Sequence, residues 1–130
     1  MARFDGKTIV LTGGGGGIGS ATCKRLAAEG GKLAIFDLNL EAAKKTAAEI
    51  VAAGGVAEAF QCDIVDRASV DAAVAAAEAK LGPVSVLVNN AGWDIFKPFV
   101  KTEPADWAKI IAINLTGALN MHHAILPGMV

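Results

Sequence analysis

A run of glycines near the start of the chain is suited to binding phosphate. Residues 12–19 read Thr-Gly-Gly-Gly-Gly-Gly-Ile-Gly and directly follow the short apolar segment 8–11. Glycines at a strand-to-helix turn let backbone N–H groups approach an anion, and the positive end of the helix dipole points at the same place. A flexible linker is the alternative interpretation, but the strand and helix predicted on either side of the run disfavour it.

An acidic residue further along the chain makes this turn typical of a dinucleotide site. Asp37 ends a second apolar segment, residues 33–36, and an acidic residue about 20 positions after such a turn accepts hydrogen bonds from ribose hydroxyls. Its charge would repel a 2′-phosphate, and neither Leu38 nor Asn39 beside it could hold one. NAD is therefore favoured over NADP as the cofactor. The alternative is that Asp37 is only a solvated carboxylate near the start of the next helix.

The elements that would position these residues alternate between strand and helix. Short apolar segments bounded by turn residues predict strands, and apolar residues at helical spacing predict helices. Strands are expected at 7–12, 32–37, 56–62 and 84–89, and helices at 18–29, at 41–53, from the N-cap Asp66 to 81, and, after a loop over 90–102, from Pro104 onward. Such alternation produces right-handed crossovers and a parallel sheet. We therefore expect an α/β fold with a Rossmann-type doubly wound parallel sheet, strand order 3-2-1-4, and one domain over residues 1–130.

The fourth predicted strand and the overall composition add further expectations. Residues 84–89 are nearly all apolar, which predicts a strand buried on both faces. A formal net charge of −1 on 130 residues provides no basic surface for nucleic acid or an anionic membrane. No apolar segment reaches the roughly 18 residues that cross a bilayer, and no signal peptide is recognisable, so a cytoplasmic protein is expected. Cys23 and Cys62 lack metal-ligand spacing and His122 and His123 would diverge on a helix, so we expect no metal site.

Three motifs follow one another along the chain: the glycine run at 12–19, Asn89-Asn90-Ala91-Gly92, and Ile113-Asn114-Leu115-Thr116-Gly117. With these motifs in this order, the chain resembles the short-chain dehydrogenase/reductase family over its whole length. The glycine run fits both the general Rossmann spacing and the family's own turn, so by itself it does not decide between them. Asn89-Asn90-Ala91-Gly92 directly after the fourth predicted strand is similar to the family's second motif. Ile113-Asn114-Leu115-Thr116-Gly117, inside the last predicted helix, is similar to the third. A flavin-binding or methyltransferase domain would share only the glycine turn.

The resemblance implies a set of cofactor-binding residues around the glycine turn and the strand ends. They are Thr12, Gly13, Gly16, Gly17, Ile18, Gly19, Asp37, Leu38, Cys62, Asp63, Ile64, Asn89, Asn90, Ala91 and Gly92. Asp63 and Ile64 would flank the adenine ring, unless Asp63 is only an exposed turn residue. The segment 89–92 would line the nicotinamide-ribose side, and an equal alternative is that it ties the sheet together.

The resemblance also implies roles for three residues near the reacting groups. Asn114 would be catalytic, with its backbone and side chain holding a water molecule in a proton relay. Taken alone, an asparagine within a helix would more often be a surface residue. Trp93 and Asp94 are candidates for walls of the substrate pocket, although aromatic loop residues more often cover the core.

The family's chemistry is hydride transfer between a nicotinamide cofactor and a secondary alcohol or ketone, and it uses a tyrosine, a lysine and a serine. This chain contains no tyrosine, and Ser20, Ser69 and Ser85 are not at the family's serine position. In relatives the three catalytic residues follow the segment at which this chain stops. We therefore expect the N-terminal half of a longer dehydrogenase, or one piece of a pair with a C-terminal companion fragment, and no turnover by these residues alone. A noncatalytic dinucleotide-binding fragment is the alternative from another class.

The resemblance extends to a substrate class and an assembly. Segments 91–99 and 117–123 are similar to those of dehydrogenases that oxidise β-hydroxyacyl thioesters such as 2-hydroxycyclohexanecarboxyl-CoA, so an acyl-CoA-like substrate is expected. The alternative is a 3-oxoacyl-thioester reductase. Such reductases mostly use NADPH, which Asp37 disfavours. Relatives form homotetramers or dimers, with the long helix from Pro104 packing against a partner.

Overall fold

Four parallel strands form a single sheet in the computed structural model, which describes residues 2–130. The strands are β1 (Thr8–Thr12), β2 (Lys32–Asp37), β3 (Val56–Gln61) and β4 (Val84–Val88). Their order is β3-β2-β1-β4, with Thr8 of β1 paired with Lys32 on one side and with Val84 on the other. The predicted α/β class and strand order are therefore confirmed.

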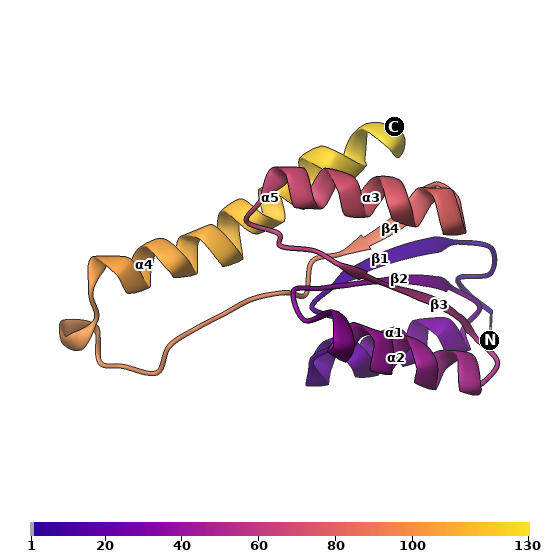
Figure 1. The fold of residues 1–130 in the computed structure, drawn as a ribbon, viewed down its shortest axis with the longest axis horizontal. Helices are drawn as coiled ribbons and strands as arrows, with labels where there is room; N and C mark the ends of the chain where they lie inside the picture. Colours follow the sequence, from indigo (N-terminus) through magenta and orange to yellow (C-terminus); the bar gives the residue numbers. More distant parts are fainter. Residues whose placement is uncertain (1) are drawn as a thin grey trace.

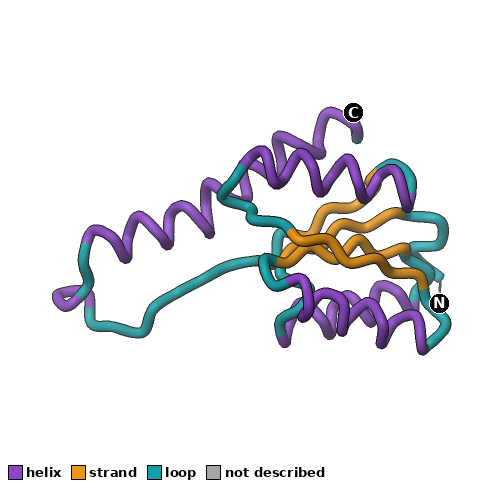
Figure 2. Tube along the Cα trace, in the orientation of Figure 1, coloured by secondary structure: helices purple, strands orange, loops and turns teal. Residues whose placement is uncertain are grey.

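Helices cover both faces of this sheet (Figures 1 and 2). The helices α1 (Gly17–Ala28) and α2 (Leu40–Ala52) lie on one face, and α3 (Arg67–Leu81) and α5 (Gly117–Ile125) lie on the other. The helix α4 (Pro104–Ile111) and the loop before it extend beyond the carboxyl ends of the strands (Figure 1). No helix within residues 2–130 is long and apolar enough to cross a membrane.

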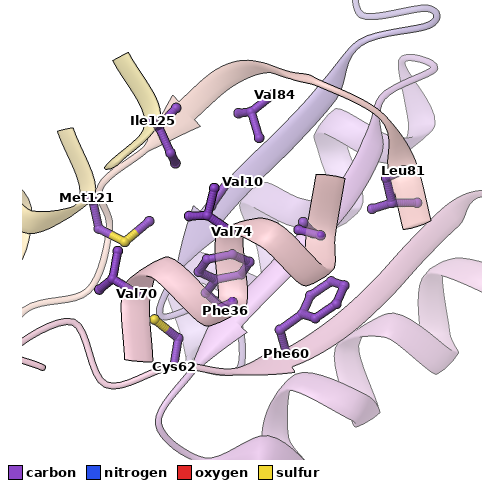
Figure 3. Packing of buried hydrophobic residues seen from close by; sticks show 13 residues of the cluster. Val10, Phe36, Phe60, Cys62, Val70, Val74, Leu81, Val84, Met121 and Ile125 are labelled. Carbon is purple, nitrogen blue, oxygen red and sulfur yellow. The ribbon is translucent and has the colours of Figure 1, made fainter. Parts of the chain in front are cut away.

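Two hydrophobic clusters result from the alternation of side chains along the central strands. Ile9 and Leu11 of β1 point toward α1 and α2, and they pack with Cys23. Val10 between them points to the opposite face, where Phe36, Val70 and Met121 complete a second cluster (Figure 3). Phe36 and Phe60 meet edge to face there, with ring centroids 5.8 Å apart. The two inner strands are thus buried on both faces, as residues at the centre of a parallel α/β sheet must be.

The predicted helix boundaries agree with the structure to within one residue. Asp66 caps α3 as predicted, accepting a hydrogen bond from the backbone N–H of Ala68. Pro104 occupies the first turn of α4, also as predicted, because its missing N–H is not needed there. A short 3₁₀ turn, Phe99–Lys101, interrupts the predicted loop.

The long helix predicted from Pro104 is present as a continuous helical run to Ile125, with a π-helical turn at Ala112–Thr116 between α4 and α5. One expectation about the C-terminal part of the chain is wrong. The strand β4 is not buried on both faces: Val84 is buried, but Ser85 is exposed and the other residues are half-buried. Within residues 2–130 no second strand pairs with β4, so its apolar sequence is covered only in part.

Candidate functional site

A cleft of about 900 Å³ opens at the carboxyl ends of the strands. This is the edge of a parallel α/β sheet at which ligands bind, next to the point where the strand order reverses. Most of the predicted cofactor-binding residues line it: Gly13, Gly16, Gly17, Ile18, Gly19, Asp37, Leu38, Cys62, Asp63, Ile64, Asn90, Ala91 and Gly92. Trp93 lines it too, and an adjoining hollow is lined by Gly92, Trp93, Asp94, Ile110 and Asn114.

Packing explains why residues 13 and 19 are glycines. Gly13 has a φ of +70°, a conformation that residues with a side chain rarely adopt. A Cβ atom on Gly19 would collide with the carbonyl oxygen of Gly13. The turn is held against the next strand by the N–H of Gly13, which donates to Phe36 O at 2.7 Å. These two glycines therefore shape the turn itself.

Gly16 and Gly17 have a different role, because the protein leaves room for a side chain at both. A Cβ on Gly17 would meet no atom within 4 Å, and one on Gly16 would make only an ordinary contact, 3.5 Å from Gly13 O. Both residues line the cleft, in front of the first turn of α1, which has no side-chain cap and no acidic residue. The free N–H groups there favour a negatively charged group. The cradle therefore has space and polarity for a phosphate.

Asp37 lies at the end of β2, where it is fixed by two backbone groups. Its Oδ2 accepts a hydrogen bond from the N–H of Gly15 at 2.9 Å, and its Oδ1 accepts one from the N–H of Asn39 at 2.9 Å. Each carboxylate oxygen can accept a further hydrogen bond. The side chain is thus held in place at the rim of the cleft with capacity left for the hydroxyl groups of a ligand.

The loop after β3 provides a second, less polar wall. Asp63 uses Oδ1 to accept the N–H of Val65 at 3.1 Å, which fixes the turn. Burial raises the pKa of the neighbouring Cys62 thiol to about 11, so this thiol is protonated at neutral pH and behaves as a small apolar side chain. Together with Ile64, this loop offers an apolar surface beside a carboxylate.

Thr12 and Asn89 do not line the cleft. The Thr12 side chain is buried, and its Oγ1 accepts the N–H groups of Asn90 at 3.1 Å and Ala91 at 3.0 Å. Asn90 also donates from Nδ2 to Gly13 O at 3.3 Å. Asn89 Nδ2 lies 3.1 Å from His122 Nε2 of α5. The segment 89–91 therefore ties β4 to β1 and α5, while Asn90 and Ala91 also face the cleft.

Asn114 lies in the π-helical turn, and both ends of its amide contact one backbone unit. Its Oδ1 accepts the N–H of Trp93 at 3.0 Å, and its Nδ2 donates to Trp93 O at 2.7 Å. This pair of hydrogen bonds holds the loop after β4 against the helix. Asn114 therefore positions Trp93 at the mouth of the cleft.

Several residues that line the cleft and the adjoining hollow were not predicted from the sequence. They are Phe36, Val65, Lys109, Ala112 and Ile113 in the cleft and Ile110 in the adjoining hollow. Lys109 Nζ lies 4.0 Å from the centre of the Trp93 ring, close enough for a cation–π interaction. Positions 109, 112 and 113 have the spacing of one helix face. Ile110 lies four residues before Asn114 and faces the same hollow, so helical spacing back from Asn114 could have found it.

Known dehydrogenases are similar in sequence to this chain. The family model described as short chain dehydrogenase matches residues 7–130. Sorbitol dehydrogenase of Cereibacter sphaeroides is 41% identical over 128 residues, which cover 98% of this chain and 49% of that protein. D-threitol dehydrogenase of Mycolicibacterium smegmatis is 39% identical over 123 residues, which cover 95% of this chain and 47% of that protein.

The fold is also shared with solved structures. NAD+-bound xylitol dehydrogenase matches with a TM-score of 0.93 and 36% sequence identity, covering 98% of this chain and 49% of that one. The chain spans about half the length of the curated relatives it matches. The family model and the two relatives together cover nearly every described element, including the glycine turn, the segment 89–92 and the helix that carries Asn114. The chain belongs to the short-chain dehydrogenase family.

Proposed function

We propose that this chain binds NAD in the cleft and is the cofactor-binding half of an enzyme that interconverts a secondary alcohol and a ketone. The observation that carries the proposal is the open cradle at Gly16 and Gly17, in front of the uncapped first turn of α1. The two phosphates of a dinucleotide suit it because backbone N–H groups and the helix dipole both favour negative charge. When bound, NAD supplies the hydride acceptor.

The preference for NAD over NADP rests on Asp37. Its carboxylate is held at the rim of the cleft by two backbone N–H groups, so it would face a 2′-phosphate with like charge at short range. Leu38, which also lines the cleft, carries no compensating charge. The NAD+ in the related xylitol dehydrogenase agrees with this preference.

The other residues of the chain orient the cofactor and the substrate. Asp63 and Ile64 would contact the adenine, and Asn90 to Gly92 would lie along the nicotinamide ribose. Asn114 holds Trp93 through its side chain, and we propose that its backbone contributes to the proton relay. Trp93 and Asp94 would form part of the substrate pocket. The serine, tyrosine and lysine of the reaction would come from outside these 130 residues, in the same polypeptide or in a companion fragment.

For the substrate we propose a β-hydroxyacyl thioester such as 2-hydroxycyclohexanecarboxyl-CoA, on the resemblance of segments 91–99 and 117–123. The names of the related sorbitol, D-threitol and xylitol dehydrogenases favour a second candidate, a polyol. Both candidates contain a secondary alcohol. We further propose a homotetramer or dimer, and a cytoplasmic location, which fits the two free buried cysteines.

Calorimetric titration of the purified natural protein with NAD tests the proposal. We expect one saturable site per chain, and weaker binding of NADP. Rates of NADH formation from 2-hydroxycyclohexanecarboxyl-CoA, sorbitol and xylitol then distinguish the two substrate candidates. A folded protein that shows no saturable binding of NAD would contradict the proposed function.

A further inference from the structure

The loop Asp63–Val65 lines the cleft, and its own hydrogen bonds leave two carbonyl groups to be satisfied from elsewhere. Asp63 accepts the N–H of Val65 through Oδ1 and donates its own N–H to Ser69 Oγ at 2.9 Å. These contacts hold the loop to itself and to α3. They do not involve the carbonyl oxygens of Ile64 and Val65, which point to the helix α5.

Asn120 of α5 binds these carbonyl groups. Its Nδ2 donates to Ile64 O at 2.8 Å and lies 3.5 Å from Val65 O. Three residues earlier on the same helix, a Cβ on Gly117 would lie only 2.6 Å from Ile64 Cδ1. The Ile64 side chain therefore fits against α5 only because residue 117 is glycine. Positions three apart share one helix face, so this face holds both the backbone and the side chain of the loop.

The same helical run reaches the other end of the cleft. Ala112 and Ile113 line the cleft, and Asn114 binds the backbone of Trp93. We propose that Asn120 is a positioning residue that sets the adenine-binding loop against the helix that carries Asn114. The inference rests on the proposed binding of NAD, because it assigns the adenine to the loop 63–65.

The packing of α5 does not depend on Asn120. Met121 and Ile125 are buried in the core and attach the helix to the sheet (Figure 3), whereas Asn120 is half-buried at the rim. Loss of its amide should therefore release the loop and leave the helix in place. Asn120→Asp has almost the same shape but places an acceptor opposite two carbonyl oxygens, so it should displace the loop more than Asn120→Ala does.

The experiment measures binding of the two halves of the cofactor to the purified natural protein by calorimetry. For Asn120→Ala we expect the affinities for AMP and NAD to fall about five- to tenfold, the size of one lost hydrogen bond, and a larger loss for Asn120→Asp. The affinity for nicotinamide mononucleotide should be unchanged in both. His123→Ala is the matched control, because it removes another contact of α5, to Arg67 Nη1 at 2.9 Å, without touching the loop.

The outcomes separate this inference from the function on which it rests. Unchanged AMP affinity in both Asn120 variants, or an equal loss for nicotinamide mononucleotide, would overturn the positioning role while NAD binding by the unaltered protein stands. A loss of AMP affinity in His123→Ala as large as in Asn120→Ala would also overturn it, since general loosening of α5 would then be the cause. If the unaltered protein binds neither AMP nor NAD, the proposed function itself fails.

Discussion

At the scale of single residues, Asp37 serves both the fold and the proposed cofactor. It accepts the N–H groups of Gly15 and Asn39 and still faces the cleft. Asp37→Asn removes the charge and keeps an acceptor for one of these groups. We expect NAD to bind more weakly and NADP more tightly, so that the ratio of their dissociation constants changes at least about tenfold, or 1.4 kcal/mol. Asp63→Asn, at the other wall of the cleft, is the control and should leave the ratio unchanged in calorimetric titrations.

The side chain of Asn114 should affect the turnover of the active enzyme. Asn114→Ala removes both hydrogen bonds to the Trp93 backbone, so the loop after β4 loses its attachment at the reacting end of the cleft. We expect kcat of the active enzyme to fall by about ten- to a hundredfold, the effect of misplacing a catalytic contact, with a smaller change in the affinity for NAD. Stopped-flow and steady-state rates with the best alcohol substrate check this. An unchanged kcat would contradict the role of the Asn114 side chain in positioning the loop after β4 for the reaction.

Glu29, far from the cleft, should control part of the acid stability. Bidentate hydrogen bonds from Arg3 at 2.8 and 2.9 Å, with a further one from Arg25, lower the pKa of this buried carboxyl. Because the folded protein binds this proton less tightly than the unfolded chain, the stabilisation is complete above the ordinary value of 4.5 and is lost as the pH falls through the lowered pKa. Glu29→Gln should therefore have a lower Tm near neutral pH and a smaller loss of Tm below pH 4.5. Glu41→Gln, on an exposed carboxylate 3.6 Å from Lys44, is the control and should keep its Tm near neutral pH, because an exposed ion pair contributes little to stability.

At the scale of elements, the glycine turn should separate folding from binding. Gly17→Ala adds a methyl group where no protein atom lies within 4 Å, and Gly19→Ala adds the same group against Gly13 O. We expect Gly17→Ala to keep its Tm and to bind NAD at least about tenfold more weakly, because the methyl group projects into the cradle. Gly19→Ala should lose about 1–3 kcal/mol of stability through overpacking. Equal NAD affinity of Gly17→Ala and the unaltered protein would contradict the assignment of the cradle.

Much of the arrangement of elements follows from local sequence patterns. Apolar segments that end in polar residues predict the four strands. Because the carboxyl ends of parallel strands share one edge, the same patterns predict that Asp37 and Asp63 lie at one cleft. Tertiary contacts decide the rest. The turn at Ala112–Thr116 reads as ordinary helix in the sequence, and what distinguishes Asn114 is its pairing with Trp93, 21 residues away. The burial of β4 likewise depends on the elements packed against it, and the residues of β4 alone do not show which elements these are.

The π-helical turn also changes which residues share a face of the helical run from α4 to α5. On a regular helix, each step of four residues displaces the side chain by about 40° around the helix axis. The wider turn at Ala112–Thr116 contains an extra residue, and it offsets part of this displacement. Trp107, Ile111, Leu115 and Leu119 therefore form an apolar row, and each is 40–56% exposed.

At the scale of the whole molecule, this apolar row is the surface on which the proposed assembly should form. It lies on the helical run from Trp107 to Leu119, whose α4 end extends beyond the sheet (Figure 1). Large exposed apolar side chains in a continuous row mark protein–protein contacts more often than free surface.

We expect Leu115→Asp to dissociate the homotetramer or dimer of the natural protein, because a carboxylate buried without a partner opposes association by several kcal/mol. Light scattering coupled to size-exclusion chromatography measures the mass in solution. Lys45→Asp, on the exposed side of α2, is the control and should keep the assembly. If Leu115→Asp has the same mass as the unaltered protein while that protein is oligomeric, the apolar row is not the assembly surface and the partner binds elsewhere.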